Sequence, residues 1–232
     1  MEPPKSTLAD HIIAFNRNLE FTGRLPRGIG VLNPFQDNPE ILPISEAFYR
    51  KYYSDNRPRR LIMGINPGRL GAGATGIPFT DTKRLTEVCG LPGPEFQTHE
   101  PSSVFVYRLI EAYGGPEKFF GKYYINSVSP LGFVKQSKSG KWVNYNYYDS
   151  PELFRAITPF AHAKLREQLG WGLETGTCFS LGKKNAKYLE LLNEEGDYFD
   201  QIVPLDHPRY IVQYKARQMD AYVDTFLEAL GE

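Results

Sequence analysis

The run Leu61-Ile62-Met63-Gly64-Ile65-Asn66-Pro67-Gly68 joins an apolar segment to a single polar amide. A short apolar run bounded by Gly and Pro is typical of a buried strand that stops abruptly. Pro67 disfavours helical geometry at Asn66, so we expect the Asn66 amide to be held at the end of that strand. Ligands of open α/β sheets bind beyond the carboxyl ends of the strands. The run therefore predicts a binding site built around Asn66.

The glycines that follow this run allow a second interpretation, a nucleotide-binding loop. Gly71, Gly73 and Gly76 spell Gly-x-Gly-x-x-Gly, but Pro78 and Phe79 stand where a helix should already run. The stretch also lacks the Gly-Lys-Ser/Thr ending of a phosphate loop. We therefore discount a nucleotide cofactor. A plain strand followed by a turn-rich connection stays open on the pattern alone.

Composition limits the classes of function. The 27 basic and 27 acidic residues balance, so binding to DNA requires a local basic patch. Cys89 and Cys178 are too few for a four-cysteine zinc site or an iron-sulfur cluster, and we expect no metal and no cofactor. At 232 residues without an evident linker, the chain is expected to form a single domain over residues 1–232.

The N-terminus and the apolar runs bear on location. Glu2, Lys5 and Asp10 interrupt any apolar core of a signal peptide, and the sequence has no apolar run long enough to cross a membrane. We expect a cytoplasmic protein with no membrane partner.

Hydrophobic periodicity predicts alternating strands and helices. Strands are expected at 61–63, 122–128, 177–181 and 199–205. Helices are expected at 6–20, 45–53, 80–89, 101–113, 150–170, 183–193 and 212–230, and loops at 22–43 and 133–148. Such alternation calls for a parallel sheet with helices on both faces. The predicted fold is α/β, a three-layer α/β/α sandwich around a four-stranded, mostly parallel sheet.

Two basic segments are candidates for contact with nucleic acid. The second predicted loop mixes aromatic residues with Lys135, Lys138 and Lys141, a composition that suits single-stranded nucleic acid, where bases stack and lysines meet phosphates. A solvated hairpin or lid is the alternative there. Lys183 and Lys184 open a predicted helix, where they and the free amide groups could neutralise a phosphate or could simply be solvated.

Three short motifs together resemble a known family. Gly64-Ile65-Asn66-Pro67-Gly68 with Gly76-Ile77-Pro78-Phe79 is similar to the first motif of the single-strand-selective monofunctional uracil-DNA glycosylases. Ile202-Val203-Pro204-Leu205-Asp206-His207-Pro208-Arg209 resembles that family's strand ending in His-Pro, and Val31-Leu32-Asn33-Pro34 its upstream Asn-Pro segment. The resemblance implies a uracil-DNA glycosylase-like fold and a monomeric enzyme that hydrolyses the N-glycosidic bond of uracil in DNA.

The resemblance also implies roles for individual residues. Asn66 has no useful proton affinity, so it would position the attacking water, and His207 would donate a hydrogen bond to the base oxygen that gains charge. Phe79 would stack on a flipped base. The remaining base-binding positions implied are Met63, Gly64 and Ile65, through their backbone groups, and Gly76, which leaves room beside the base.

The residue that reads the base edge stays open between two neighbours. Alignment on Pro130-Leu131 without a gap puts Ser127 where the family has an asparagine, and Asn126 lies one residue earlier. A shift of one residue on a strand points a side chain to the opposite face, so either Asn126 reaches the pocket through a bulge or Ser127 reads the base. A serine would make the pocket roomier and would admit deaminated purines such as xanthine and hypoxanthine.

Contacts to DNA are expected around the motifs. The implied DNA-binding residues are Pro67, Gly68, Arg69, Lys183, Lys184, Pro208, Arg209 and Tyr210. Arg209 and Tyr210 are the nearest candidates to fill the gap left by a flipped base. A non-catalytic nucleotide- or nucleic-acid-binding module on the same fold is the alternative function.

Overall fold

A four-stranded parallel sheet forms the centre of the molecule, as the computed structural model describes it for residues 6–231. Its strands are β2 (Arg60–Gly64), β3 (Tyr123–Ser127), β6 (Thr177–Leu181) and β7 (Gln201–Leu205), in the spatial order β3-β2-β6-β7. All three neighbouring pairs are parallel. The predicted α/β fold with helices around a four-stranded sheet is confirmed. Glu2 and Lys5, which entered the expectation about a signal peptide, lie outside the described residues.

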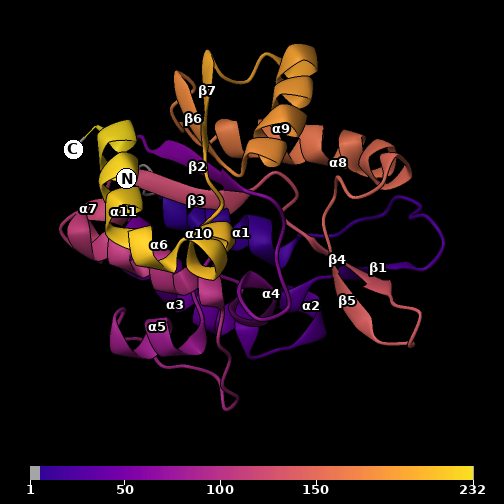
Figure 1. Cartoon of the computed structure of the whole chain (residues 1–232), viewed down its shortest axis with the longest axis horizontal. Coiled ribbons are helices and arrows are strands. Elements are labelled where there is room, and N and C mark those ends of the chain that lie inside the picture. The colour runs from indigo at the N-terminus through magenta and orange to yellow at the C-terminus, as the bar shows by residue number, and fades with distance from the viewer. Residues whose placement is uncertain (1–5, 232) are drawn as a thin grey trace, which may run out of the picture.

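Helices cover both faces of this sheet (Figure 1). The face that carries Ile62, Ile125 and Leu205 packs against α6 (Pro101–Ala112), α10 (Pro208–Tyr214) and α11 (Met219–Leu230). On the opposite face, Tyr124 and Asn126 of β3 contact α3 (Ile41–Tyr53) and α8 (Pro151–Leu169). α1 (Leu8–Arg17) packs on α3, and α9 (Lys183–Gly196) reaches the sheet through Asn185. Strand side chains alternate between the two layers, so neighbouring residues have different surroundings.

Local sequence explains where several helices begin. Thr7 caps α1 in a capping box with Asp10, each side chain bonding the other's backbone N–H. Ser150 caps α8, with a proline at the first position of that helix. The helix predicted over 80–89 is present as α5 (Thr82–Glu87), and two short helices that the periodicity did not resolve lie in the connections, α4 (Ala72–Thr75) and α7 (Pro116–Phe120).

The two segments predicted as loops contain regular structure, so the loop prediction was wrong; for residues 133–148 the structure confirms the alternative, a hairpin. Residues 22–43 include β1 (Ile29–Leu32), α2 (Pro34–Asp37) and the start of α3, and residues 133–148 include most of β4 (Gly132–Gln136) and all of β5 (Trp142–Tyr145). These strands form a second, antiparallel sheet in the order β1-β4-β5. Short strands that are only partly buried carry little alternation. β1 also pairs with a strand about a hundred residues away, so local pattern cannot reveal that pairing.

The helix predicted over 212–230 is also different. It is divided into α10, a single 3-10 turn at Ala216–Gln218, and α11. The first piece begins earlier than predicted because His207 caps it and Pro208 occupies its first position. Within residues 6–231, no helix is long and apolar enough to span a membrane.

Candidate active site

A cavity of about 170 Å³ opens where β2, β3 and β7 end. Engineered cavities of about 150 Å³ accommodate a benzene ring, so this volume suits one planar ring. The lining comes from segments far apart in the sequence: Ile65, Asn66, Pro67, Gly68, Ala72, Pro78, Phe79, Glu100, Ser102, Ser127, Asn144, Asn146, His207 and Arg209. The cavity therefore lies at the strand ends, where the sequence predicted a site.

The Asn66 amide is held by backbone groups that follow β5. Its Oδ1 accepts a hydrogen bond from the Tyr147 N–H at 3.0 Å, and its Nδ2 donates to the Tyr145 carbonyl at 3.3 Å. Nδ2 also lies 3.4 Å from the Pro67 carbonyl. A carbonyl oxygen has two lone pairs, so Oδ1 can accept one more hydrogen bond while its orientation is fixed. Asn66 is thus a preorganised acceptor at the cavity wall.

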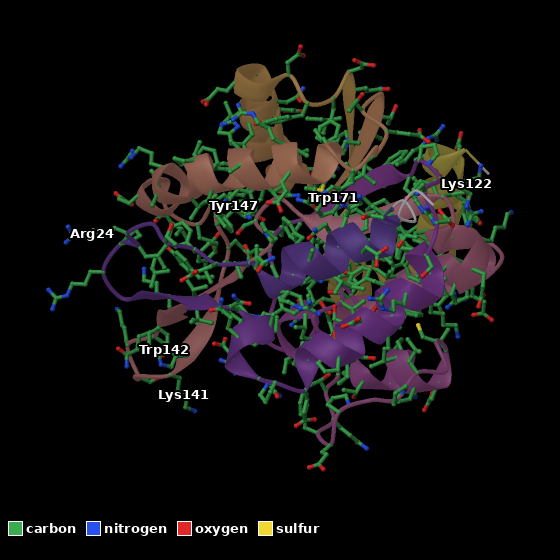
Figure 2. The ribbon with its side chains drawn as sticks, turned by 180° about the vertical axis from the view of Figure 1, so that it is seen from behind. Arg24, Lys122, Lys141, Trp142, Tyr147 and Trp171 are labelled. Atoms are coloured by element: carbon green, nitrogen blue, oxygen red, sulfur yellow. The ribbon has the colours of Figure 1, made fainter. Side chains whose placement is uncertain are left out.

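Asn185 supports Asn66 indirectly, through Tyr147 and the end of β2. Its Nδ2 donates to the carbonyls of Met63 and Gly64 at 3.1 and 3.2 Å, and its Oδ1 accepts from the Tyr147 hydroxyl at 2.9 Å. Asn185 is fully buried, as is Tyr147, which Figure 2 labels. Hydrogen bonds thus connect the end of β2 to Asn185, Asn185 to Tyr147, and Tyr147 to Asn66. They fix the end of β2 and the segment after β5 relative to each other.

Phe79 and His207 face each other across the cavity. Their ring centroids are 6.0 Å apart, with the planes inclined by 58°. Phe79 has a φ of 53°, in the left-handed region that aromatic residues rarely adopt. Strain of this kind persists where the surroundings hold it, and it is concentrated at functional sites. The surrounding structure therefore holds Phe79 in this rare backbone conformation, which places its ring at the cavity.

His207 is a neutral hydrogen-bond donor in this structure. The backbone N–H of Arg209 donates to His207 Nδ1 at 3.1 Å, so the ring proton must lie on Nε2. Burial, together with the nearby Arg209 guanidinium, lowers the pKa of His207 to about 4. Because the imidazole is uncharged near neutrality, its Nε2–H can stabilise a developing anion without carrying a positive charge itself.

The two candidates for base reading occupy different environments. Ser127 lines the 170 Å³ cavity, and its hydroxyl has no hydrogen-bond partner among the described residues. Asn126 points to the other face of the sheet, where its Nδ2 donates to Tyr124 Oη at 2.8 Å and to Gln168 Oε1 at 2.6 Å. Its Oδ1 accepts from the Ser127 N–H. The Asn126 amide therefore already has hydrogen-bond partners within the protein, although it borders a neighbouring cavity of about 20 Å³.

Glu100 is a cavity residue that the sequence analysis missed. Its Oε2 is buried without a hydrogen-bond partner, and it fills the space that a side chain at Gly71 would need. Burial, with the neighbouring Asp81 carboxylate, raises the pKa of Glu100 to about 7. Among the described residues that line the cavity, Glu100 alone carries a carboxyl group.

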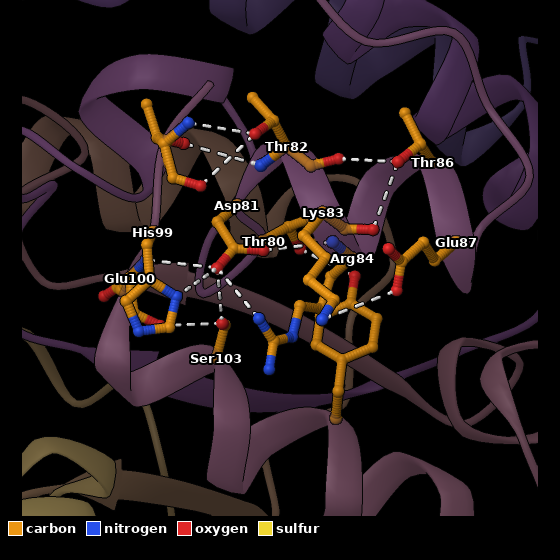
Figure 3. Close-up of polar contacts among 12 residues, drawn as sticks. Thr80, Asp81, Thr82, Lys83, Arg84, Thr86, Glu87, His99, Glu100 and Ser103 are labelled. Carbon is orange, nitrogen blue, oxygen red and sulfur yellow. Dashed lines mark hydrogen bonds and ion pairs between the residues drawn. The ribbon is translucent and has the colours of Figure 1, made fainter.

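Asp81 is the buried hub that holds the Glu100 segment in place (Figure 3). Its carboxylate accepts from the Glu100 N–H at 3.1 Å, the Ser103 hydroxyl at 2.9 Å and the Arg84 N–H at 3.0 Å. The Arg84 guanidinium lies 3.2 Å away. Asp81 therefore ties the start of α5 to the start of α6, and both to the loop that carries Phe79.

Several predicted base-binding residues lie away from the cavity. Met63 and Gly64 do not line it, because their carbonyls bond Asn185; only Ile65 of that trio reaches the wall. Gly76 borders the smaller cavity instead. Its φ is 71°, and a Cβ there would lie 2.6 Å from the Phe35 ring, so glycine is required by conformation and by packing.

The predicted DNA-binding residues divide into two groups. Pro67, Gly68 and Arg209 line the cavity, and Arg69 and Tyr210 are exposed near it. The others lie outside the lining: Pro208 is buried as the first residue of α10, Lys183 pairs with Asp206 at 3.7 Å, and Lys184 pairs with Asp149 at 3.8 Å. No group of three His, Cys, Asp or Glu side chains in residues 6–231 is arranged to hold a metal ion.

Comparison with known proteins identifies the family. A model of the uracil DNA glycosylase superfamily matches residues 50–231. The chain belongs to this superfamily. The crystal structure of wild-type Pedobacter heparinus SMUG2 is similar to this uracil DNA glycosylase over 97% of each chain, with a TM-score of 0.94 and 49% sequence identity. A comparison with curated protein sequences gives no significant match.

These matches confirm the resemblance on which the sequence analysis relied. The chain is a DNA glycosylase, a hydrolase of N-glycosyl bonds that acts on DNA in base excision repair. Asn66, Phe79 and His207 were expected to meet and do line one cavity. Asn185, Tyr147 and Glu100 were missed, because buried positioning residues carry no short motif, and their contacts span up to 122 positions of sequence.

Proposed function

We propose that this glycosylase removes uracil and the deaminated purines xanthine and hypoxanthine, and that it is monofunctional. The observation that carries the proposal is the meeting of Asn66, Phe79 and His207 around a cavity sized for one planar ring. A target base must leave the stack to reach such a cavity. The base would lie against the Phe79 ring, with its charged edge toward His207.

Cleavage of the N-glycosidic bond develops positive charge on the sugar and negative charge on the departing base. Asn66 Oδ1, fixed by the Tyr147 N–H, is suited to orient a water toward the sugar carbon. His207 Nε2–H is suited to bond the base oxygen on which charge accumulates. Asn66 is a poor general base, so its contribution lies in holding the water in place, and His207 supplies the stabilisation of the leaving group.

Ser127 is the proposed reader of the base edge. Its free hydroxyl faces the cavity and can both donate and accept, whereas the Asn126 amide bonds Tyr124 and Gln168. A hydroxyl fixes fewer atoms of the base than an amide does, and it occupies less space. This supports a pocket that admits xanthine and hypoxanthine besides uracil.

The absence of lysine from the cavity lining supports a monofunctional reaction. A glycosylase that also cleaves the strand forms a Schiff base through an amine, and none of the described lining residues offers a side-chain amine. We also propose that the chain acts as a single-domain monomer in the cytoplasm.

The test is excision from single-stranded oligonucleotides that each carry one uracil, xanthine or hypoxanthine, followed by alkali cleavage. We expect alkali-labile sites with all three bases, and intact strands when alkali is omitted. Retention of the DNA without alkali-labile sites would mean a binding module rather than an enzyme. Cleavage without alkali would contradict the monofunctional assignment.

A further inference from the structure

The antiparallel sheet β1-β4-β5 and the loop beside it concentrate positive charge. Residues 21–36, 65–80 and 129–148 together contain six Lys or Arg and no Asp or Glu, in a chain with 27 residues of each sign. The six cations are all exposed: Arg24, Arg27, Arg69, Lys135, Lys138 and Lys141. Figure 2 shows Arg24 and Lys141 on one side of the molecule, with Lys122 on the other. Lys135 pairs with Val143 and lies over the Tyr145 ring, so it projects from the face of the sheet opposite Trp142 and Asn144. We call the other five residues the cationic patch.

The charge of the cationic patch is not neutralised locally. None of its five side chains forms an ion pair with a carboxylate of the described residues. Several other exposed cations do have such partners, as Lys183 does in Asp206 and Arg108 does in Asp220. A patch of one sign within a neutral protein attracts polyanions at short range, within about 10 Å at moderate ionic strength.

Hydrogen bonds and close packing connect the cationic patch to the candidate active site. The Arg69 N–H donates to Asn144 Oδ1 at 3.2 Å, and the Arg69 guanidinium donates to the Trp142 carbonyl. Gly132 allows β4 to approach the Asn66 loop closely, since a Cβ there would lie 2.4 Å from the Pro67 carbonyl. Asn144 itself lines the cavity. A ligand bound on this sheet therefore continues into the cavity.

Trp142 provides an exposed aromatic surface beside the cavity. It lies two residues before Asn144 on β5, so both side chains project from the same face of the strand, about 7 Å apart along it. The ring is 47% exposed, with its inner edge over Gly30 of β1. The indole therefore lies about 7 Å along β5 from a residue of the cavity wall, within reach of a nucleotide close to the flipped one.

We propose that the cationic patch and Trp142 form the binding surface for the single-stranded DNA that flanks the flipped nucleotide. The cations contact phosphates, and the indole stacks on an unpaired base near the one in the cavity. Exposed aromatic rings among lysines bind single strands because only unpaired bases offer a free face. This inference rests on the proposed function for the position of the flipped base, but strand binding itself does not require catalysis.

The test uses the whole protein and a labelled single strand of about 16 nucleotides without any damaged base. Affinity is measured by fluorescence anisotropy over a range of NaCl concentrations. Combining Lys138→Gln and Lys141→Gln should weaken binding about tenfold at low salt, and should reduce the slope of log affinity against log salt by about 1.4. Trp142→Ala should weaken binding by about 5- to 150-fold with little change in that slope.

Matched controls separate this site from general charge effects. Lys83→Gln and Lys122→Gln remove the same charge from a different part of the surface, and this double variant should bind like the wild type. An equal loss in the control, or an unchanged salt slope in the sheet variant, overturns the proposal. Equal effects of Trp142→Ala on single-stranded and fully paired DNA overturn the assignment to single strands.

Excision measurements distinguish failure of this inference from failure of the proposed function. For uracil-containing strands, the sheet variants should show an increase in Kd that is much larger than any decrease in the excision rate at saturating enzyme. A loss confined to the rate at saturation would overturn the binding role. If no base were excised at all, the proposed function would fail, while the anisotropy result would still decide whether the sheet binds DNA.

Discussion

The cavity and the sheet β1-β4-β5 meet at Asn144 but differ in how firmly their polar side chains are held. In the cavity, the uncharged Asn66 and His207 side chains are oriented by backbone N–H groups, Asn66 by that of Tyr147 and His207 by that of Arg209. On the sheet, the side chains of the cationic patch are exposed and form no ion pair among the described residues. Preorganised groups stabilise a transition state, whereas mobile surface charges attract any strand and are screened by salt. Chemistry and strand capture should therefore respond to different perturbations.

The largest effect is expected from Asn66→Ala. The variant loses the oriented water acceptor and should excise uracil on the order of 10³- to 10⁴-fold more slowly in single-turnover assays, with little change in DNA affinity. Asn144→Ala, which removes another amide from the same cavity wall, is the control and should cost less than about tenfold. Excision by Asn66→Ala within about threefold of wild type would show that Asn66 does not act in the chemical step.

His207→Ala should slow the chemical step by roughly 10²- to 10³-fold, the usual cost of one lost donor to a developing anion. His207→Asn is the matched control, because its side chain can still accept the Arg209 N–H and can still donate an amide N–H, so the loss should be smaller. Since the pKa of His207 is about 4, its neutral form should keep the rate flat from pH 6 to 8 once Glu100 is replaced by Gln. A steep fall above pH 7 in that background would indicate an imidazolium instead.

Glu100→Gln tests the cavity through stability. The folded pKa of about 7 exceeds the ordinary value of 4.5, so the native protein binds a proton more tightly than the unfolded chain. Stability should therefore fall as pH rises from about 4.5 to 7, by up to about 3 kcal/mol. Glu100→Gln cannot ionise, and should unfold at higher denaturant concentration than wild type at pH 8, with little difference at pH 4.5. Equal midpoints at pH 8 would show that the carboxyl is solvated.

Ser127→Asn addresses base choice and has the smallest expected effect. An amide restores a paired donor and acceptor for uracil while crowding larger bases, so xanthine and hypoxanthine excision should fall relative to uracil by ~1–3 kcal/mol. Asn126→Ala should leave base choice unchanged, because that amide bonds Gln168 and Tyr124, although the protein should lose stability. The reverse pattern, with base choice following Asn126, would remove Ser127 from the proposed role.

The sequence predicted those parts of the site that lie next to strong local signals. Asn66 follows an apolar strand and precedes a proline, and His207 precedes another, so strand-end positions could be assigned without coordinates. The opposite directions of Asn126 and Ser127 also follow from strand geometry alone. The central sheet was predictable for the same reason, because its strands are short, buried apolar runs between helices.

What could not be predicted depends on long-range contacts. β1 becomes a strand only because β4, about a hundred residues later, offers a partner, and its segment looks like a Gly- and Pro-rich loop in isolation. Asn185 supports Met63 across 122 positions. The raised pKa of Glu100 depends on Asp81, whose position is set by α5 and α6 together. Such features are properties of the assembled fold rather than of any window of sequence.

The hydrogen bond that starts α10 also bears on how this glycosylase tells damaged bases from normal ones. His207 Nδ1 is occupied by the Arg209 N–H, so the ring can share its remaining proton but cannot give it away without becoming an imidazolate. In the proposed reaction the base therefore leaves as an anion, and its own acidity sets the ease of departure. Deamination replaces an electron-donating amino group by a carbonyl, which makes the base a better leaving group. Lesions would thus be favoured by leaving-group chemistry itself, before any side chain reads the edge of the ring.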